Sequence, residues 1–150
     1  MTKKELYSQV FRHINSVSEF RSPELWKEII ELCPQYKVTC KAFKAVCEEP
    51  RLNMAITASP FKSWSKSLNG IEAYLQCGEY YDIDSDSGFF LLEAEITAFD
   101  LSSLIIDLKN QGFDVPAHIL RMGKQEEELI SLEIHSLKKP RITSWFELFY

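Results

Sequence analysis

The sequence predicts an α+β fold, with N-terminal helices followed by an antiparallel or mixed sheet of about five strands and a helix packed on one face of that sheet. In the first 50 residues, apolar side chains recur at the helical period of about 3.6. From residue 51 onwards, several segments alternate apolar and polar side chains, as half-buried strands do. The length of 150 residues with 45% hydrophobic content predicts one domain, with a helical part at 1–50 and a sheet-rich part at 51–150.

The first two helices have clear start signals. Thr2 and Glu5 have the spacing of a capping box, in which the hydroxyl and the carboxylate satisfy free backbone amides, and this helix is expected to reach about residue 17. Pro23 suits the first position of a second helix, because its missing amide hydrogen has no helical partner there. Pro34 is expected to end this second helix.

The chain is then expected to change from helix to strand. Thr39 is a candidate cap for a third helix, which closes before Pro50. Residues 51–57 alternate apolar and polar side chains and predict a strand. Residues 61–70 place three large apolar side chains on one helical face, which favours a short helix.

A hairpin and a helix are expected next. Residues 71–83 and 89–97 are predicted to be paired strands, joined by a turn at 85–88 whose small residues tolerate a tight reversal. Asp100 is the expected cap of an amphipathic helix that Gly112 ends.

Two more strands and a docked tail complete the prediction. The strands are expected at 115–122 and 129–137. Residues 145–150 contain five large apolar side chains out of six, so this tail is expected to dock on its own domain rather than remain exposed.

Charge is unevenly distributed along the chain. The formal net charge is −5, but residues 71–133 contain 14 Asp and Glu against Lys109, Arg121 and Lys124, a balance of −11. A surface of one sign attracts molecules of opposite charge and repels those of like charge. This acidic stretch disfavours nucleic acid and favours a basic protein as a partner.

None of the partial enzyme, cofactor-binding or metal-binding motifs in the sequence is expected to form a functional site. Ser63 and Lys66 fit the S-x-x-K spacing of penicillin-recognising enzymes, but the companion signatures are absent, so a surface helix is the preferred interpretation. The four cysteines lack the closely spaced ligand pairs of a zinc site and are expected to be reduced. No residue is therefore assigned to catalysis, and an active pair formed by one of the three histidines only in space stays open.

A calcium loop is a weaker alternative for the acidic residues near position 82. Asp82, Asp84, Asp86 and Glu93 have the spacing of EF-hand ligands. The glycine required at the sixth position is displaced to Gly88, and strands rather than helices are expected on both sides. A solvated acidic hairpin is therefore preferred over a calcium site.

The candidate site is an acidic surface with aromatic anchors. Inhibitors of nucleases place carboxylates where the enzyme expects phosphates, and aromatic side chains strengthen such interfaces. The sequence therefore predicts a non-enzymatic binding protein that neutralises or regulates a basic protein, such as a nuclease toxin, in the manner of an immunity protein or antitoxin. The residues assigned to partner binding are Glu79, Tyr80, Tyr81, Asp82, Asp84, Asp86, Glu93, Glu95, Glu126, Glu127 and Glu128.

A second hypothesis comes from another class of function. A small enzyme or ligand-binding domain would place a pocket between sheet and helices, lined by Trp26, Trp64 or Trp145. Under either hypothesis a cytoplasmic location is expected. The longest apolar run, 89–92, is too short for a membrane span, and the N-terminus lacks the features of a signal peptide.

Overall fold

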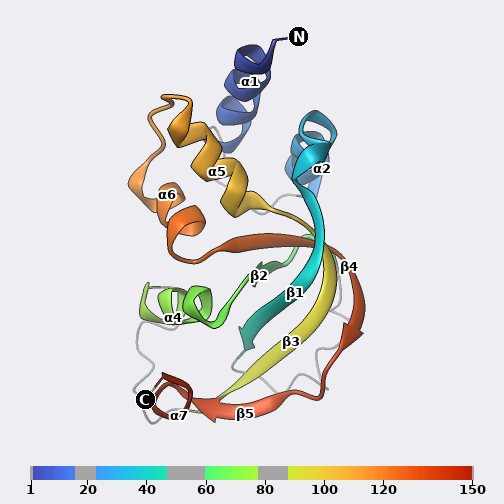
Figure 1. Cartoon of the computed structure of the whole chain (residues 1–150), viewed down its shortest axis with the longest axis vertical. Coiled ribbons are helices and arrows are strands. Elements are labelled where there is room, and N and C mark those ends of the chain that lie inside the picture. The colour runs from blue at the N-terminus through green and yellow to red at the C-terminus, as the bar shows by residue number, and fades with distance from the viewer. Residues whose placement is uncertain (1, 16–22, 47–59, 78–87, 150) are drawn as a thin grey trace.

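The computed structural model describes residues 2–15, 23–46, 60–77 and 88–149, and it confirms the predicted α+β class (Figure 1). All pairings between the described strands are antiparallel. The strands are β1 (Lys37–Val46), β2 (Ser63–Ser65), β3 (Gly88–Phe99), β4 (Glu128–Leu137) and β5 (Arg141–Ser144). The helices are α1 (Lys3–Asn15), α2 (Pro23–Leu32), the 3-10 turn η1 (Pro34–Tyr36), α4 (Leu68–Cys77), α5 (Leu101–Asn110), α6 (Ala117–Lys124) and α7 (Trp145–Phe149).

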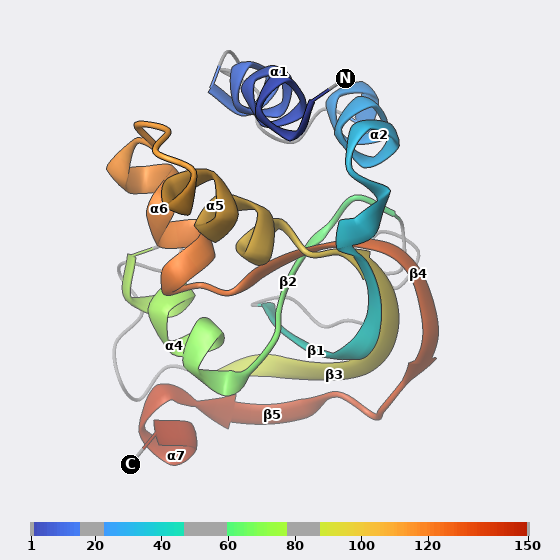
Figure 2. The same ribbon diagram turned by 45° about the horizontal axis from the view of Figure 1, so that its top comes forward.

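Four of the strands form a closed ring. β3 pairs with β1 along one edge, and with β5 and then β4 along the other. β4 continues onto β2, and β2 returns to β1 through the pair formed by Phe43 and Ser65. The order β1–β2–β4–β3–β1 is therefore a small barrel, and the long strands curve strongly around it (Figure 2). β5 lies outside the ring as an edge strand below β3.

The barrel interior is filled by apolar side chains from alternate positions. Trp64 is 1% exposed and lies in this cluster. Small residues on β1 and β3 leave space for the large indole, since protein interiors pack without voids. The buried members of the cluster are Ala42, Trp64, Leu92, Ala94, Ile96, Ala98 and Leu129.

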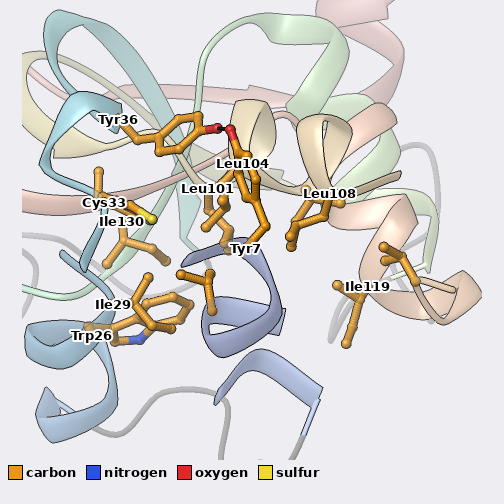
Figure 3. Close-up of a cluster of buried hydrophobic side chains, with 14 residues drawn as sticks. Tyr7, Trp26, Ile29, Cys33, Tyr36, Leu101, Leu104, Leu108, Ile119 and Ile130 are labelled. Atoms are coloured by element: carbon orange, nitrogen blue, oxygen red, sulfur yellow. Dashed lines mark hydrogen bonds between the residues drawn. The ribbon is translucent and has the colours of Figure 1, made fainter. Parts of the chain in front are cut away.

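A second core joins the helices to the end of the barrel that lies uppermost in Figure 1, and Figure 3 shows its side chains. It contains a polar chain in which the hydroxyls of Tyr7 and Tyr36 are 2.7 Å apart and Tyr36 donates to Asp107 at 2.5 Å. These contacts connect α1 to η1 and α5. Cys33 is buried in the same core, and burial raises its pKa to about 11, so this thiol is unreactive at neutral pH.

A third core covers the lower outer side of the barrel. Ile71 and Leu75 of α4 pack there with Phe89 of β3. Leu148 and Phe149 of α7 pack against the same cluster, so the described part of the C-terminal tail docks on its own domain, as the sequence predicts.

The predicted third helix is wrong, because residues 37–46 form β1. Val38 and Ala42 face the barrel interior, whereas Thr39 and Lys41 are exposed. The helical part of the domain therefore does not extend to residue 50. Pairing with β3 at ten successive positions stabilises the strand more than a single capping residue stabilises a helix.

The predicted helix at 61–70 and the predicted strand at 71–83 are also wrong where the structure describes them. Residues 63–65 form β2, and α4 occupies 68–77. Ile71 and Leu75 are four residues apart, which places both on the helical face that covers the third core. The hairpin between 71–83 and 89–97 is replaced by the pairing of β3 with β1, β4 and β5.

The predicted strand at 115–122 is helix α6 instead. Val115 and Ile119 pack into the helical core, and Gly123 approaches the side chain of Ile105 so closely that a Cβ there would lie 2.9 Å from it. β5 was not predicted. The predicted strand at 51–57 and most of the turn at 85–88 lie outside the described residues.

The remaining elements agree with the sequence. Thr2 and Glu5 exchange the two capping-box hydrogen bonds, and Asp100 caps α5 by accepting from the amide of Ser103 at 3.1 Å. α2, β3 and β4 lie where their periodicity predicts them. Among the described helices, the longest is α1 with 13 residues, and none has the length and apolar content needed to cross a membrane.

Candidate protein-interaction surface

The outward-facing side of β1, β3 and β4 carries polar side chains from three neighbouring strands. Ala94, Ile96 and Ala98 of β3 point into the barrel, so the intervening residues of this strand point outwards. We call this surface the outer polar face. Its members are Thr39, Lys41, Glu93, Glu95, Thr97, Glu133 and His135.

A chain of side-chain contacts crosses the outer polar face. The hydroxyl oxygens of Thr39 and Thr97 are 3.0 Å apart, and Thr97 Oγ1 lies 2.6 Å from Nε2 of His135. Nδ1 of His135 lies 3.9 Å from a carboxylate oxygen of Glu133. These contacts tie the outer sides of β1, β3 and β4 together.

Thr97, His135 and Glu133 have the residue types of a nucleophile, a base and an orienting acid, but their geometry does not support catalysis. The side chains of His135 and Glu133 are 41% and 70% exposed. At 3.9 Å, the carboxylate is beyond hydrogen-bonding distance and does not fix the imidazole. The group stands on an open sheet surface, where developing charge would be stabilised by water rather than by fixed dipoles.

Glu93, at one end of the outer polar face, is engaged by basic side chains. Lys138 donates a hydrogen bond to its carboxylate, and this bond, with the nearby charges of Lys41 and Arg141, holds the pKa of Glu93 below its ordinary value. Glu93 also lies in the middle of β3 rather than in a loop, and the other predicted calcium ligands, at 82–86, lie outside the described residues.

Glu95 and Glu133 differ from Glu93. Lys41 lies directly opposite Glu95 in the β1–β3 register, yet in the described part of the chain no ion pair or hydrogen bond joins Glu95 to another side chain. Glu133 lies opposite Thr97, and among the described residues its only ion-pair candidate within 4 Å is the imidazole of His135. Both carboxylates are exposed.

The three consecutive carboxylates at 126–128 lie just before and at the start of β4 and interact with groups of their own chain. Glu128 is only 4% exposed and accepts a hydrogen bond from Ser63 at 2.7 Å. Glu127 has a positive φ of 51° and accepts from Ser67. Glu126 also has a partner. The structure therefore does not bring these residues onto one surface with Glu95.

The remaining predicted contact residues lie outside the described residues. They are Glu79, Tyr80, Tyr81, Asp82, Asp84 and Asp86. Within the described ranges, no group of three or more His, Cys, Asp or Glu side chains is placed to hold a metal ion.

The S-x-x-K residues do not form a catalytic pair. Ser63 lies in β2 rather than on a surface helix and donates to Glu128. Nζ of Lys66 lies 2.8 Å from Asp100 and 3.2 Å from Ser103, so this lysine holds the start of α5 against the barrel.

Two of the three tryptophans that were candidates for lining a pocket are buried in the protein core instead. Trp26 and Trp64 are each 1% exposed and fill two different cores, so neither lines an open pocket. The side chain of Trp145 lies outside the described residues.

Sequence reasoning missed the roles of Thr97, Glu133 and His135. The available signal was strand periodicity, because positions 93, 95 and 97 alternate with apolar residues, as do 133 and 135.

Comparisons with known proteins identify no relative of this chain. No family model, no curated protein and no solved structure matches it.

Proposed function

We propose that this protein is a non-enzymatic binding protein that neutralises or regulates a basic protein partner, as an immunity protein or antitoxin does. The outer polar face is the contact surface, with Glu95 and Glu133 as its acidic anchors. One observation carries the proposal: these two carboxylates have no Lys or Arg partner among the described residues, whereas Glu93, Glu127 and Glu128 are engaged within the chain.

The physical argument concerns both association rate and complementarity. Exposed carboxylates attract Lys and Arg side chains over roughly 10 Å at moderate salt, which accelerates the encounter with a basic protein. In the complex, an Arg can donate two hydrogen bonds to one carboxylate. A nuclease is one such partner, because its phosphate-binding residues accept carboxylates in place of the nucleic acid. The acidic residues 79–86 are a second contact region in the same proposal.

A cytoplasmic location is part of the proposal. Cys33 and Cys40 are both free thiols, which supports a reducing compartment.

A capture experiment tests the proposal. The purified protein would be used as bait in lysate from its source cells, at about 50 mM and about 500 mM salt, because salt screens exposed charges. The expected result is one basic protein retained in near-stoichiometric amount and bound more weakly at high salt. The complex would then be measured with purified components by calorimetry.

A pair of matched variants locates the contact. The double variant E95Q/E133Q removes two charges from the outer polar face, and E31Q/D114N removes two exposed charges elsewhere. We expect the first to lose retention and the second to keep it. Equal retention by both variants would move the site away from the outer polar face, and recovery of no specific basic protein would contradict the function.

A further inference from the structure

The edge strand β5 carries an exposed apolar side chain next to a basic cluster. Ile142 is 70% exposed, and it is the one large hydrophobic residue with an exposed side chain among the described residues. Lys139 and Arg141 are also exposed. Glu93 lies close to Arg141 and already accepts a hydrogen bond from Lys138, so Lys139 and Arg141 give this edge a surplus of positive charge among the described residues.

Among the described strands, β5 is bonded to a neighbour on one side only. In the described part of the chain it pairs with β3 through four residues, and both ribbon views place it at the lower margin of the molecule (Figures 1 and 2). The outer backbone groups of such a strand are available to another extended chain. Proteins often add a peptide strand to an edge of this kind.

We propose that the β5 edge binds an extended acidic segment of a partner protein by strand addition. The backbone of that segment pairs with the outer edge of β5. Because neighbouring residues of a strand face opposite sides, an apolar residue of the segment contacts Ile142 while an acidic residue beside it faces Arg141. A further acidic residue of the segment meets Lys139, which lies just before β5.

Charge decides between this occupant and a second copy of the same chain. Pairing two β5 edges would place Lys139 and Arg141 of both copies close together, and like charges across paired strands are destabilising. Basic residues at an edge are a common protection against self-association, but that protection does not act against an acidic segment. The inference is independent of the outer polar face, which has its own partner.

The test uses an octapeptide of alternating Glu and Val with a fluorescent label. Binding is measured by fluorescence anisotropy, and the contact is mapped from backbone NMR shifts. We expect binding that weakens with salt and shifts centred on β5. Two control peptides should bind at least about tenfold more weakly. A Lys-Val peptide loses charge complementarity, and a Glu-Val peptide with N-methyl groups on alternate residues loses backbone pairing.

Protein variants complete the test. R141E should weaken binding by about tenfold or more because attraction becomes repulsion, and K124E makes the same charge change on distant α6 and should leave binding unchanged. I142T keeps the β-branched shape and should weaken binding several-fold. Equal binding of the N-methylated peptide, or of the Glu-Val peptide to R141E, would overturn the proposal. A dimer of the wild-type chain that I142T dissociates would also overturn it, because the edge would then belong to a second copy.

Discussion

Carboxylates at the start of β4 differ in what they contact from those on the outer polar face, although all of them come from one acidic stretch. Glu127 and Glu128 accept hydrogen bonds from Ser67 and Ser63, and they hold the turn before β4 against β2 and α4. Glu95 and Glu133 are exposed on the outer polar face. The comparison shows that a surplus of negative charge in a sequence contains two populations, one that stabilises the fold and one that faces solvent or a partner.

The largest effect is expected at Asp100, which belongs to the first population. This residue is 8% exposed, caps α5 and pairs with Lys66 at 2.8 Å. Asp100→Ala removes the cap and leaves polar groups unsatisfied, so the free energy of unfolding should fall by about 2–4 kcal/mol in urea denaturation.

Two further variants separate the cap from the ion pair. Asp100→Asn keeps a good N-cap residue but removes the charge, so it should lose less stability than Asp100→Ala. Asp114→Ala, at an exposed aspartate, should change stability by less than about 0.5 kcal/mol. Equal losses for Asp100→Ala and Asp114→Ala would mean that Asp100 does not belong to the first population.

The next largest effect on stability is expected at Glu128, and β4 also carries Glu133 as a matched comparison. Glu128→Ala leaves the hydroxyl of Ser63 without its acceptor in a partly buried site, and about 1–3 kcal/mol of stability should be lost. Glu133→Ala changes the same residue type on the same strand, and its stability should stay within about 0.5 kcal/mol of the wild type. Partner binding should show the opposite order. A larger loss of stability for Glu133→Ala would reverse the comparison.

A smaller effect is expected at Gly70, where α4 passes the acidic turn. A Cβ at this position would lie 2.5 Å from the carbonyl oxygen of Glu126. Gly70→Ala should therefore destabilise the protein by about 1 kcal/mol net, because the steric cost exceeds the gain in helix propensity.

The matched glycine control is Gly88→Ala. An added Cβ there would meet its nearest atom, the carbonyl oxygen of Thr143, only at 3.8 Å. This change should not lower the melting temperature. If Gly70→Ala is equally neutral, α4 does not pack against the acidic turn as closely as the structure indicates.

The elements predicted correctly are those whose signals are local. The capping box of α1, the Asp100 cap of α5 and the long alternation of β3 need no information from distant residues. β1 and α6 were predicted wrongly because their conformation depends on partners far along the chain. β1 pairs with β3 about 50 residues away, and α6 packs against α5 through Gly123 and Ile105. Tertiary contacts of this kind override local preference.

The sequence predicts that the candidate site contains acidic side chains, but it does not predict which side chains lie next to one another. Glu95 was identified from charge alone, whereas Thr97 and His135 were missed, since their contact depends on the register between β3 and β4. That register contains irregularities on both sides of Thr97, so the facing residues do not follow from counting along the strands. Glu128 was assigned to the partner-binding surface because of its charge. In the structure its side chain is buried and accepts a hydrogen bond from Ser63.

The smallest effect concerns Glu93, which lies between the two populations because it is on the outer polar face and yet pairs with Lys138. Lys138→Met should raise the pKa of Glu93 towards its ordinary value, although the charges of Lys41 and Arg141 will keep some of the lowering. Side-chain carboxyl titration by NMR measures this pKa directly. Lys139→Met, at the neighbouring exposed lysine, should leave the pKa of Glu93 unchanged.

The pH dependence of stability follows from the direction of this shift. A carboxyl whose pKa is lower in the folded protein contributes stability above its unfolded pKa, which is about 4.3, and loses that contribution as pH falls through the folded value. The wild type should therefore be more stable than Lys138→Met near pH 7, and the difference should shrink below about pH 4 as Glu93 is protonated. A difference that persists unchanged at pH 2 would come from the packing of the Lys138 side chain. Glu93 would then belong with Glu95 and Glu133 as a carboxylate available to a partner.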